Sequence, residues 1–181
     1  LLLSAAPGAM AQDANTPGDT STLARALGEG LRRIHASPVA DCPFDMRLAI
    51  RLTRAAWNIE VGLVDEPDVR ANHSVSLLDL LHRLEATRPS EPPADLVFVH
   101  GDYCLPNILI TSDAGDAPHV SAFLDWGRAG ISDRYQDLAI GARSLRHNLG
   151  PGWESTFFEA YGLADPDPVR MAYYEALDEL F

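Results

Sequence analysis

The stretch that decides the fold is residues 100–107, HGDYCLPN, together with residues 125–128, DWGR. Around these segments lie three apolar runs typical of short buried strands: residues 96–99, 107–111 and 120–124. Residues 113–116, DAGD, indicate a hairpin turn between the last two runs. Because the strands of a hairpin run antiparallel, we expect Asn107 and Asp125 at the same end of it, beside a loop that carries Asp102.

The remainder of the sequence predicts helices. Apolar side chains recur at helical spacing, and capping residues such as Asp19 and the pair Asp167–Pro168 precede them. Residues 62–72, which are polar and acidic and contain Pro67, are interpreted as a loop. We therefore expect a mostly α-helical α+β domain with a small inserted hairpin. The helices are expected at residues 19–37, from about 45, at 76–84, at 133–149, at 153–161 and from 167 to the end.

Composition excludes some classes of function. The chain has 181 residues, 46% of them hydrophobic, and a formal net charge of −12. Nucleic acids need basic surfaces, so a nucleic-acid partner is not expected, and no apolar run is long enough to span a membrane. An acidic cleft would suit a cationic ligand, although the charge could also serve solubility alone. All 14 basic residues are Arg, and Lys is absent.

The cysteines and the first residues carry less information. Cys42 and Cys104 match no zinc spacing, and two isolated thiols suit a reducing, cytoplasmic location. Residues 1–3 (LLL) and 9–11 (AMA) imitate a secretion signal, but no basic residue precedes them and Pro7 interrupts them. We interpret this start as the interior of a longer protein, beginning partway along a buried strand.

The polar residues around the hairpin suit phosphoryl transfer. Asn107 and Asp125 would offer the hard oxygen ligands that Mg²⁺ prefers, with phosphate and water completing its shell. Asp102 would stand free of the metal and accept a proton from a hydroxyl nucleophile. A hydrolase that uses His100, Asp102 and Asp125 on a metal is an alternative, but it would need more ligands than these segments supply.

These residues resemble a known fold and, within it, a known family. Residues 100–102 with Asn107, then residues 125–127, resemble the catalytic-loop and metal-binding motifs of the protein-kinase-like fold. Several longer segments resemble the aminoglycoside 3'-phosphotransferases, and they occur in the same order: residues 41–45, 99–110, 127–130, 133–139 and 177–181. The resemblance covers essentially the whole chain, as the C-terminal lobe of that fold.

The resemblance implies a role for each matching residue. Asp102 corresponds to the catalytic aspartate, and Asn107 and Asp125 correspond to the magnesium ligands. Backbone groups around Ser4 and Ala6 would meet the adenine of ATP. The residues that would bind the aminoglycoside are Arg128, Asp178, Glu179, the terminal carboxylate of Phe181 and, in the acidic loop, Asp65 and Glu66.

It also implies a division of the chain. Residues 1–8 would end the hinge strand and form the hinge, and residues 9–181 would form the C-terminal lobe. That lobe would hold the catalytic loop 100–107, the metal loop 125–128 and substrate-binding helices in 45–86 and 133–181. The family's N-terminal lobe supplies a phosphate-binding Lys, which this chain cannot replace. We therefore expect the chain alone to be inactive, and its uncovered apolar surface to favour self-association.

Other residues have simpler interpretations. His100 is expected to hold its loop by hydrogen bonding, Asp133 to cap a helix, Asp137 to brace the catalytic loop and Cys104 to fill space. Two alternative functions remain open. One is a kinase of another small hydroxylated molecule such as choline, homoserine, a sugar or a macrolide. The other is a non-catalytic module that binds aminoglycosides without ATP. The acidic residues Asp178 and Glu179 favour a polycationic acceptor.

Overall fold

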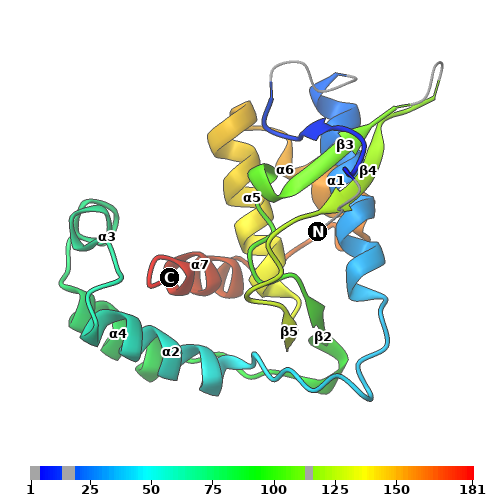
Figure 1. Ribbon diagram of the computed structural model, residues 1–181. Helices are drawn as coiled ribbons and strands as arrows, with labels where there is room; N and C mark the ends of the chain where they lie inside the picture. Colours follow the sequence, from blue (N-terminus) through cyan, green and yellow to red (C-terminus); the bar gives the residue numbers. More distant parts are fainter. Residues whose placement is uncertain (1–4, 14–18, 113–115) are drawn as a thin grey trace.

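The computed structural model describes residues 5–13, 19–112 and 116–181. Helices dominate it, and the strands form two small antiparallel sheets, so the predicted α+β class with an inserted hairpin is confirmed (Figure 1). The strands are β1 (Ala9–Met10), β2 (Leu96–Val99), β3 (Ile108–Thr111), β4 (His119–Phe123) and β5 (Gly130–Asp133). The α-helices are α1 (Thr20–His35), α2 (Leu48–Glu60), α3 (Glu66–His73), α4 (Leu77–Ala86), α5 (Tyr135–Leu149), α6 (Glu154–Tyr161) and α7 (Pro168–Asp178).

The hairpin of β3 and β4 brings together the two strand ends that the sequence predicted to be neighbours. β1, β3 and β4 form one sheet, and β2 pairs with β5 in the other. Ile108 pairs with Phe123, and the Leu124 N–H donates to the Asn107 carbonyl at 2.8 Å. Asn107 and Asp125 therefore share one end of the hairpin, as expected. The predicted turn lies mostly outside the described residues, which omit 113–115.

Capping side chains begin the helices where the sequence indicates. The Asp19 carboxylate accepts the N–H of Thr22 at 2.7 Å, and the Ser76 hydroxyl accepts that of Asp79 at 3.2 Å. Asp167 caps α7, whose first residue is Pro168. Each cap satisfies a backbone donor that the first turn leaves free, which fixes the helix start.

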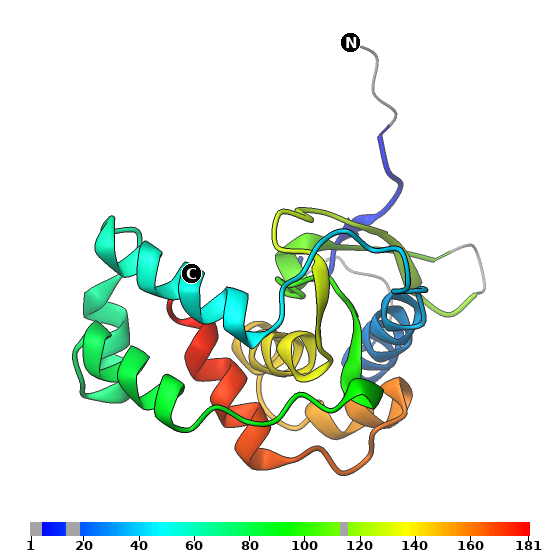
Figure 2. The ribbon, with the colours of Figure 1, turned by 90° about the horizontal axis from the view of Figure 1, so that it is seen from below.

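The helices pack around two apolar clusters. The first lies between α1, the hairpin and α6, and includes Leu31, Ile110 and Phe157. The second lies between α2, α4 and α7, and includes Leu80 and Leu177. Helix α5 contributes side chains to both clusters, so it forms the central partition. Figures 1 and 2 show α2, α3 and α4 as a group set apart from the hairpin, with α7 between them and α5.

Three boundaries differ from the sequence prediction. Residues 62–72 are not a loop throughout, because α3 begins at Glu66. Pro67 does not break this helix, since a proline in the first turn lacks only an N–H that the helix would leave unpaired. The helix expected from Asp45 begins at Leu48, because Phe44 and Met46 exchange backbone hydrogen bonds with Ile131. The helix expected from Asp133 begins at Tyr135, after β5, which was not predicted.

The structure describes the first segment only from Ala5 onward. Ser4 and the expected hinge strand, residues 1–3, lie outside the described residues. The Pro7 carbonyl accepts the Ser121 hydroxyl at 2.6 Å, which ties the segment before β1 to β4. In the described ranges, no helix is both long and apolar enough to cross a membrane.

Candidate functional site

The loop that carries Asp102 is fixed by the buried carboxylate of Asp137 on α5. The two oxygens of Asp137 accept the N–H of His100 at 2.7 Å and that of Gly101 at 2.8 Å. The His35 ring on α1 contacts the same carboxylate at 3.0 Å. The side chain of Asp137 is fully buried, so this contact works as an internal brace between two helices and the loop.

His100 closes the loop from the other side. Its ring Nε2 lies 2.8 Å from the Leu124 carbonyl at the end of β4, and the ring is buried. The ring also packs against Trp126, with centroids 4.6 Å apart. These contacts connect the loop of Asp102 to the segment of Asp125, which is the holding role expected of His100.

The contacts of Asp133 and the burial of Cys104 suit structural roles for both residues. Asp133 is the last residue of β5, and its carboxylate accepts the N–H of Tyr135 at 2.9 Å and pairs with Arg170. It therefore serves the start of α5, although it does not occupy the capping position itself. Burial and the neighbouring Asp102 raise the pKa of the Cys104 thiol to about 12. Cys104 therefore stays protonated at neutral pH, which disfavours a role as nucleophile.

Asp102 and Asn107 lie in direct contact. The Asn107 amide donates to the Asp102 carbonyl at 3.1 Å and to its carboxylate at 3.0 Å. Asp102 is partly exposed, so its carboxylate remains accessible from solvent. Asp125 is exposed and adopts a left-handed backbone conformation with φ of 58°, which turns the chain sharply after β4.

The residues at this end of the hairpin fit a magnesium ion that takes most of its ligands from phosphate and water. Asn107 and Asp125 offer one amide and one carboxylate, the hard oxygen donors that Mg²⁺ takes. Within residues 5–13, 19–112 and 116–181, no three His, Cys, Asp or Glu side chains are grouped so that they could hold a metal ion. The protein alone would therefore supply few ligands, and phosphate oxygens and water would supply the others.

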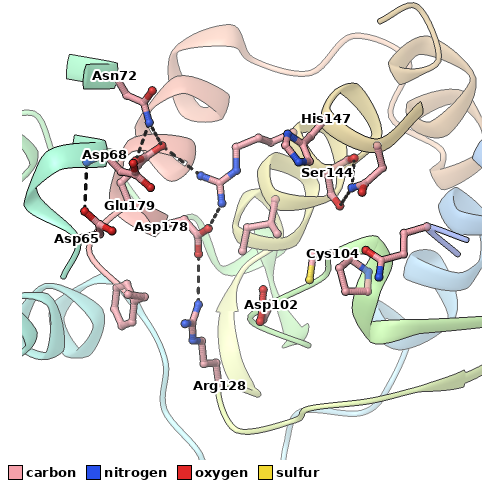
Figure 3. A pocket seen from close by; sticks show the side chains of 16 residues that line it. Asp65, Asp68, Asn72, Asp102, Cys104, Arg128, Ser144, His147, Asp178 and Glu179 are labelled. Atoms are coloured by element: carbon pink, nitrogen blue, oxygen red, sulfur yellow. Dashed lines mark hydrogen bonds and ion pairs between the residues drawn. The ribbon is translucent and has the colours of Figure 1, made fainter. Parts of the chain in front are cut away.

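A cavity of about 590 Å³ opens beside Asp102 (Figure 3). Its wall is formed by the loop that carries Asp102, by α3 and α5, and by the end of α7. Five of its side chains are carboxylates: Asp65, Asp68, Asp102, Asp178 and Glu179. Its other lining residues are Gln12, Asn72, Cys104, Pro106, Arg128, Ile140, Arg143, Ser144, His147, Asn148 and Phe181.

The carboxylates of α7 are held by arginines. Asp178 is buried and forms ion pairs with Arg143 and, at 3.5 Å, with Arg128. Burial raises the pKa of the Asp178 carboxyl above its ordinary value, while Arg143, Arg51 and Arg128 act in the opposite direction. Glu179 lies 3.4 Å from Arg143 and accepts the Asn72 amide at 3.1 Å. Figure 3 shows this chain of contacts across the cavity.

Phe181 and Arg128, which were predicted to bind the ligand, are brought together. The Arg128 guanidinium lies 5.3 Å from the centroid of the Phe181 ring, within the range of a cation–π contact. Both residues line the cavity with Asp178 and Glu179. With Asp65, the structure therefore collects five of the six predicted binding residues around one space with Asp102.

Glu66 does not line this cavity, contrary to the prediction. The formation of α3 explains why. Asp65, Asp68 and Asn72 follow helical spacing and all line the cavity, whereas Glu66 points elsewhere on the helix and pairs with Arg70 at 2.6 Å. Reading residues 62–72 as a loop concealed this periodicity, so Asp68 and Asn72 were missed as cavity residues.

Helix α5 supplies the other residues that the sequence did not reveal. Ile140, Arg143, Ser144 and His147 line the cavity at spacings of three and four residues, as one face of a helix does. This periodic signal is visible in the sequence, but it marks a face without indicating what the face borders. Of the two residues expected beside adenine, Ser4 is outside the described residues and Ala6 is exposed before β1.

The sequence pattern of the phosphotransferase enzyme family matches residues 1–174. The chain belongs to this phosphotransferase family. It is 39% identical over 154 residues to an aminoglycoside 3'-phosphotransferase of Niallia circulans, which covers 84% of the chain and 56% of that relative. The chain thus spans little more than half the length of this curated relative.

Solved structures of aminoglycoside phosphotransferases share the fold of this family member. The crystal structure of aminoglycoside-3'-phosphotransferase of type VIII matches with a TM-score of 0.86 and 34% identity, over 98% of this chain and 67% of that one. Aminoglycoside phosphotransferase APH(3'')-Id from Streptomyces rimosus, solved with ADP and streptomycin, matches with a TM-score of 0.77 and 30% identity, over 96% and 67%. The chain is therefore similar to aminoglycoside phosphotransferases in both its sequence and its fold.

Proposed function

We propose that the intact protein transfers a phosphoryl group from ATP to the 3'-hydroxyl of an aminoglycoside antibiotic and so confers resistance. The observation that carries the proposal is the position of Asp102. Its carboxylate opens into a cavity whose other acidic residues come from α7 and from the start and body of α3. The carboxylate of Asp102 lies on the loop of residues 100–107, and the other carboxylates lie on the opposite wall (Figure 3).

Asp102 would orient the acceptor hydroxyl and take its proton. Asn107 holds the Asp102 carboxylate at 3.0 Å, and the brace of Asp137 fixes the loop on which both stand. In this family of reactions, catalysis depends mainly on such positioning and on neutralising charge. Asn107 and Asp125 would hold Mg²⁺, which neutralises phosphate charge when bound.

The opposite wall would recognise a polycation. An aminoglycoside carries several ammonium groups, and carboxylates bind such groups through short charge-assisted hydrogen bonds. Asp178 and Glu179 are now paired with Arg143, and Asp65 and Asp68 are exposed. The ammonium groups of the antibiotic would take over as partners of these carboxylates, which places the sugar hydroxyls toward Asp102.

Several parts of the activity would require residues beyond this chain. The chain contains no Lys, so a phosphate-binding lysine must come from elsewhere in the protein. The proposal keeps the division in which residues 1–8 would end the hinge strand and form the hinge, with Ser4 and Ala6 beside adenine, and residues 9–181 would form a C-terminal lobe that is inactive alone. Both cysteines are free in the structure, which supports a cytoplasmic location.

A different hydroxyl of the antibiotic is the principal competing proposal. The similar structure from Streptomyces rimosus, named for the 3'' position, was solved with streptomycin. A panel of substrates separates the two. The intact protein should phosphorylate kanamycin and protect susceptible bacteria from it, but not from a 3'-deoxy aminoglycoside. Streptomycin as the preferred substrate would contradict the 3' assignment, and phosphorylation of choline or a macrolide alone would contradict the aminoglycoside proposal.

A binding experiment on this chain addresses the non-catalytic alternative. The acidic residues Asp65, Asp68, Asp178 and Glu179, which would bind the antibiotic, all belong to this chain. We expect calorimetric titration of the chain with kanamycin, without ATP, to show salt-sensitive binding that the double variant Asp178→Ala, Glu179→Ala loses. Binding by the chain with no phosphorylation by the intact protein would favour a module that only captures the antibiotic.

A further inference from the structure

Arg51 on α2 is a buried cation for which the described residues provide no hydrogen-bond acceptor. Its side chain is fully buried, and in the part of the chain that the structure describes none of its guanidinium nitrogens finds an acceptor. Burial lowers the pKa of Arg51 to about 10, so the side chain remains charged at neutral pH. A buried charge is costly unless something nearby compensates it, so the surroundings of Arg51 should show what it does.

Two groups of the cavity wall compensate this charge. The Arg51 guanidinium lies 4.3 Å from the centroid of the Phe181 ring, closer than Arg128, which lies 5.3 Å from the same ring. Asp178 is the acidic group with the largest favourable effect on the charge of Arg51, and Arg51 in turn favours the ionised form of Asp178. The cavity wall opposite Asp102, formed by α3, α5, α7 and Phe181, is called the recognition wall. Arg51 lies behind this wall, where it contacts the Phe181 ring and its charge acts on Asp178.

Accessibility separates Arg51 from the other arginines near Asp178. Arg128 and Arg143 line the cavity and are partly exposed, so an incoming ammonium group can replace them at the carboxylate. Arg51 does not line the cavity and has no exposed surface. A ligand cannot displace it, so it is the one of the three cations whose position is independent of occupancy.

We propose that Arg51 is a positioning residue of the aminoglycoside pocket, which holds the ring of Phe181 in place and supplies a buried, fixed positive charge to the cavity wall that contains Asp178. This inference rests on the proposed function for the identity of the ligand. A role in packing alone would be different: an apolar side chain of similar length would then serve equally well.

The test compares Arg51→Met and Arg51→Lys in the intact protein, with Arg25→Met as the control. Arg25 is exposed on α1 and does not line the cavity. We expect Arg51→Met to raise KM for kanamycin about tenfold, with kcat and KM for ATP within about twofold of wild type. Arg25→Met should leave all three constants unchanged, and thermal unfolding should show that each variant is folded.

A second measurement does not depend on activity. The titration of the Asp178 carboxyl, followed by NMR, should move to higher pH in Arg51→Met, because a cation that favours the carboxylate has been removed. Arg51→Lys keeps the charge but not the planar group over Phe181. It should leave the Asp178 titration nearly unchanged and raise KM about threefold.

The outcomes are distinguishable. A folded Arg51→Met protein with wild-type KM and an unchanged Asp178 titration overturns the inference. If Arg51→Met does not fold, a wild-type KM in Arg51→Lys overturns it instead. If the wild-type protein phosphorylates no aminoglycoside, the proposed function fails, while the Asp178 titration still tests the coupling to Arg51.

Discussion

Two buried carboxylates, one behind the loop of Asp102 and one in the wall of the cavity, are held in different ways. Asp137 accepts two backbone N–H groups of the Asp102 loop and contacts His35, and none of these partners faces the cavity. Asp178 is held by the arginines Arg128 and Arg143, which line the cavity. The first arrangement is part of the fold and does not change with occupancy, whereas the second consists of counterions that a ligand can exchange.

The difference suggests separate roles for the two regions: phosphoryl transfer at the loop of Asp102 and ligand binding around Asp178. The end that would accept a proton is positioned by main-chain donors, whose geometry is set by β2, α1 and α5. The end that would bind ammonium groups is positioned by flexible, charged side chains. Changes at the first end should therefore affect rate and folding, and changes at the second should affect affinity and its dependence on pH and salt.

The largest effect is expected from Asp102→Asn. The amide has nearly the same shape but cannot accept the proton of the hydroxyl, so kcat should fall by about 100- to 10,000-fold. Steady-state kinetics of the intact protein with kanamycin would measure this. Calorimetry should show unchanged affinity for the antibiotic, and a variant that keeps more than a tenth of wild-type kcat would exclude Asp102 as the base.

Breaking the brace is expected to lower stability next. Asp137→Ala removes the acceptor of the His100 and Gly101 N–H groups and leaves both buried donors unpaired, at a cost of about 3 kcal/mol. Urea unfolding measures the change. Asp137→Asn keeps one oxygen acceptor and should lose less. Equal losses in the two variants would mean that the volume of the side chain, and not its hydrogen bonds, supports the loop.

At the recognition end, Asp178→Asn should raise KM for kanamycin about thirtyfold, because a hydrogen bond to a charged group is worth about 2 kcal/mol. Glu175→Gln provides the control. Glu175 lies on the same helix, pairs with Arg146 at 2.7 Å and does not line the cavity. A similar rise in KM in both variants would indicate a general effect of charge and not a specific contact.

The raised pKa of Asp178 gives this end its own pH dependence. The carboxylate binds ammonium groups only when ionised, so affinity should fall as the pH drops through the pKa of Asp178. Because this pKa lies above that of an ordinary Asp, the loss should begin at a higher pH than an exposed carboxylate would cause. Antibiotic affinity measured against pH in wild type and Asp178→Asn checks this, and the variant should lack that phase.

The smallest effect is expected on α3. Asp68→Asn should raise KM about two- to fivefold, because an exposed ion pair contributes less than 1 kcal/mol. Glu66→Gln, two residues away on a different side of the helix, should leave KM unchanged. The same kinetic assay measures both. A larger effect from Glu66 would show that α3 turns when the antibiotic binds.

A local sequence pattern placed the residues around the hairpin, whereas residues of the cavity wall opposite Asp102 were predicted only through the family resemblance. Residues 100–107 and 125–128 are close in sequence to the hairpin that joins them, so a local pattern was enough to bring Asn107 and Asp125 together. The recognition wall is assembled from α3, α5 and α7, which are far apart in the chain. Which face of α5 borders a cavity depends on tertiary packing, so no local pattern could identify Arg143 or His147.

The errors have the same origin. A proline and several acidic residues at 65–68 resemble a loop locally, yet the Asp65 side chain accepts the N–H of Asp68 at 3.3 Å and begins a helix. Residues 130–133 became a strand because β2 offers an antiparallel partner. Arg51 could not be recognised as a residue behind the cavity, because its surroundings come from α2, α7 and the residues after α7.

Gly101 links the two ends and, under the proposed function, limits how antibiotic preference could evolve. Its φ is 85°, and a Cβ at this position would lie 2.1 Å from the carbonyl oxygen of Arg128. Any other residue there would displace the Asp102 loop and a wall of the pocket together, so selection cannot use this position to adjust drug preference gradually. His147, exposed on α5 at the same cavity, carries no such constraint. Under the proposed function, we expect changes of antibiotic preference to arise at His147 and not at Gly101.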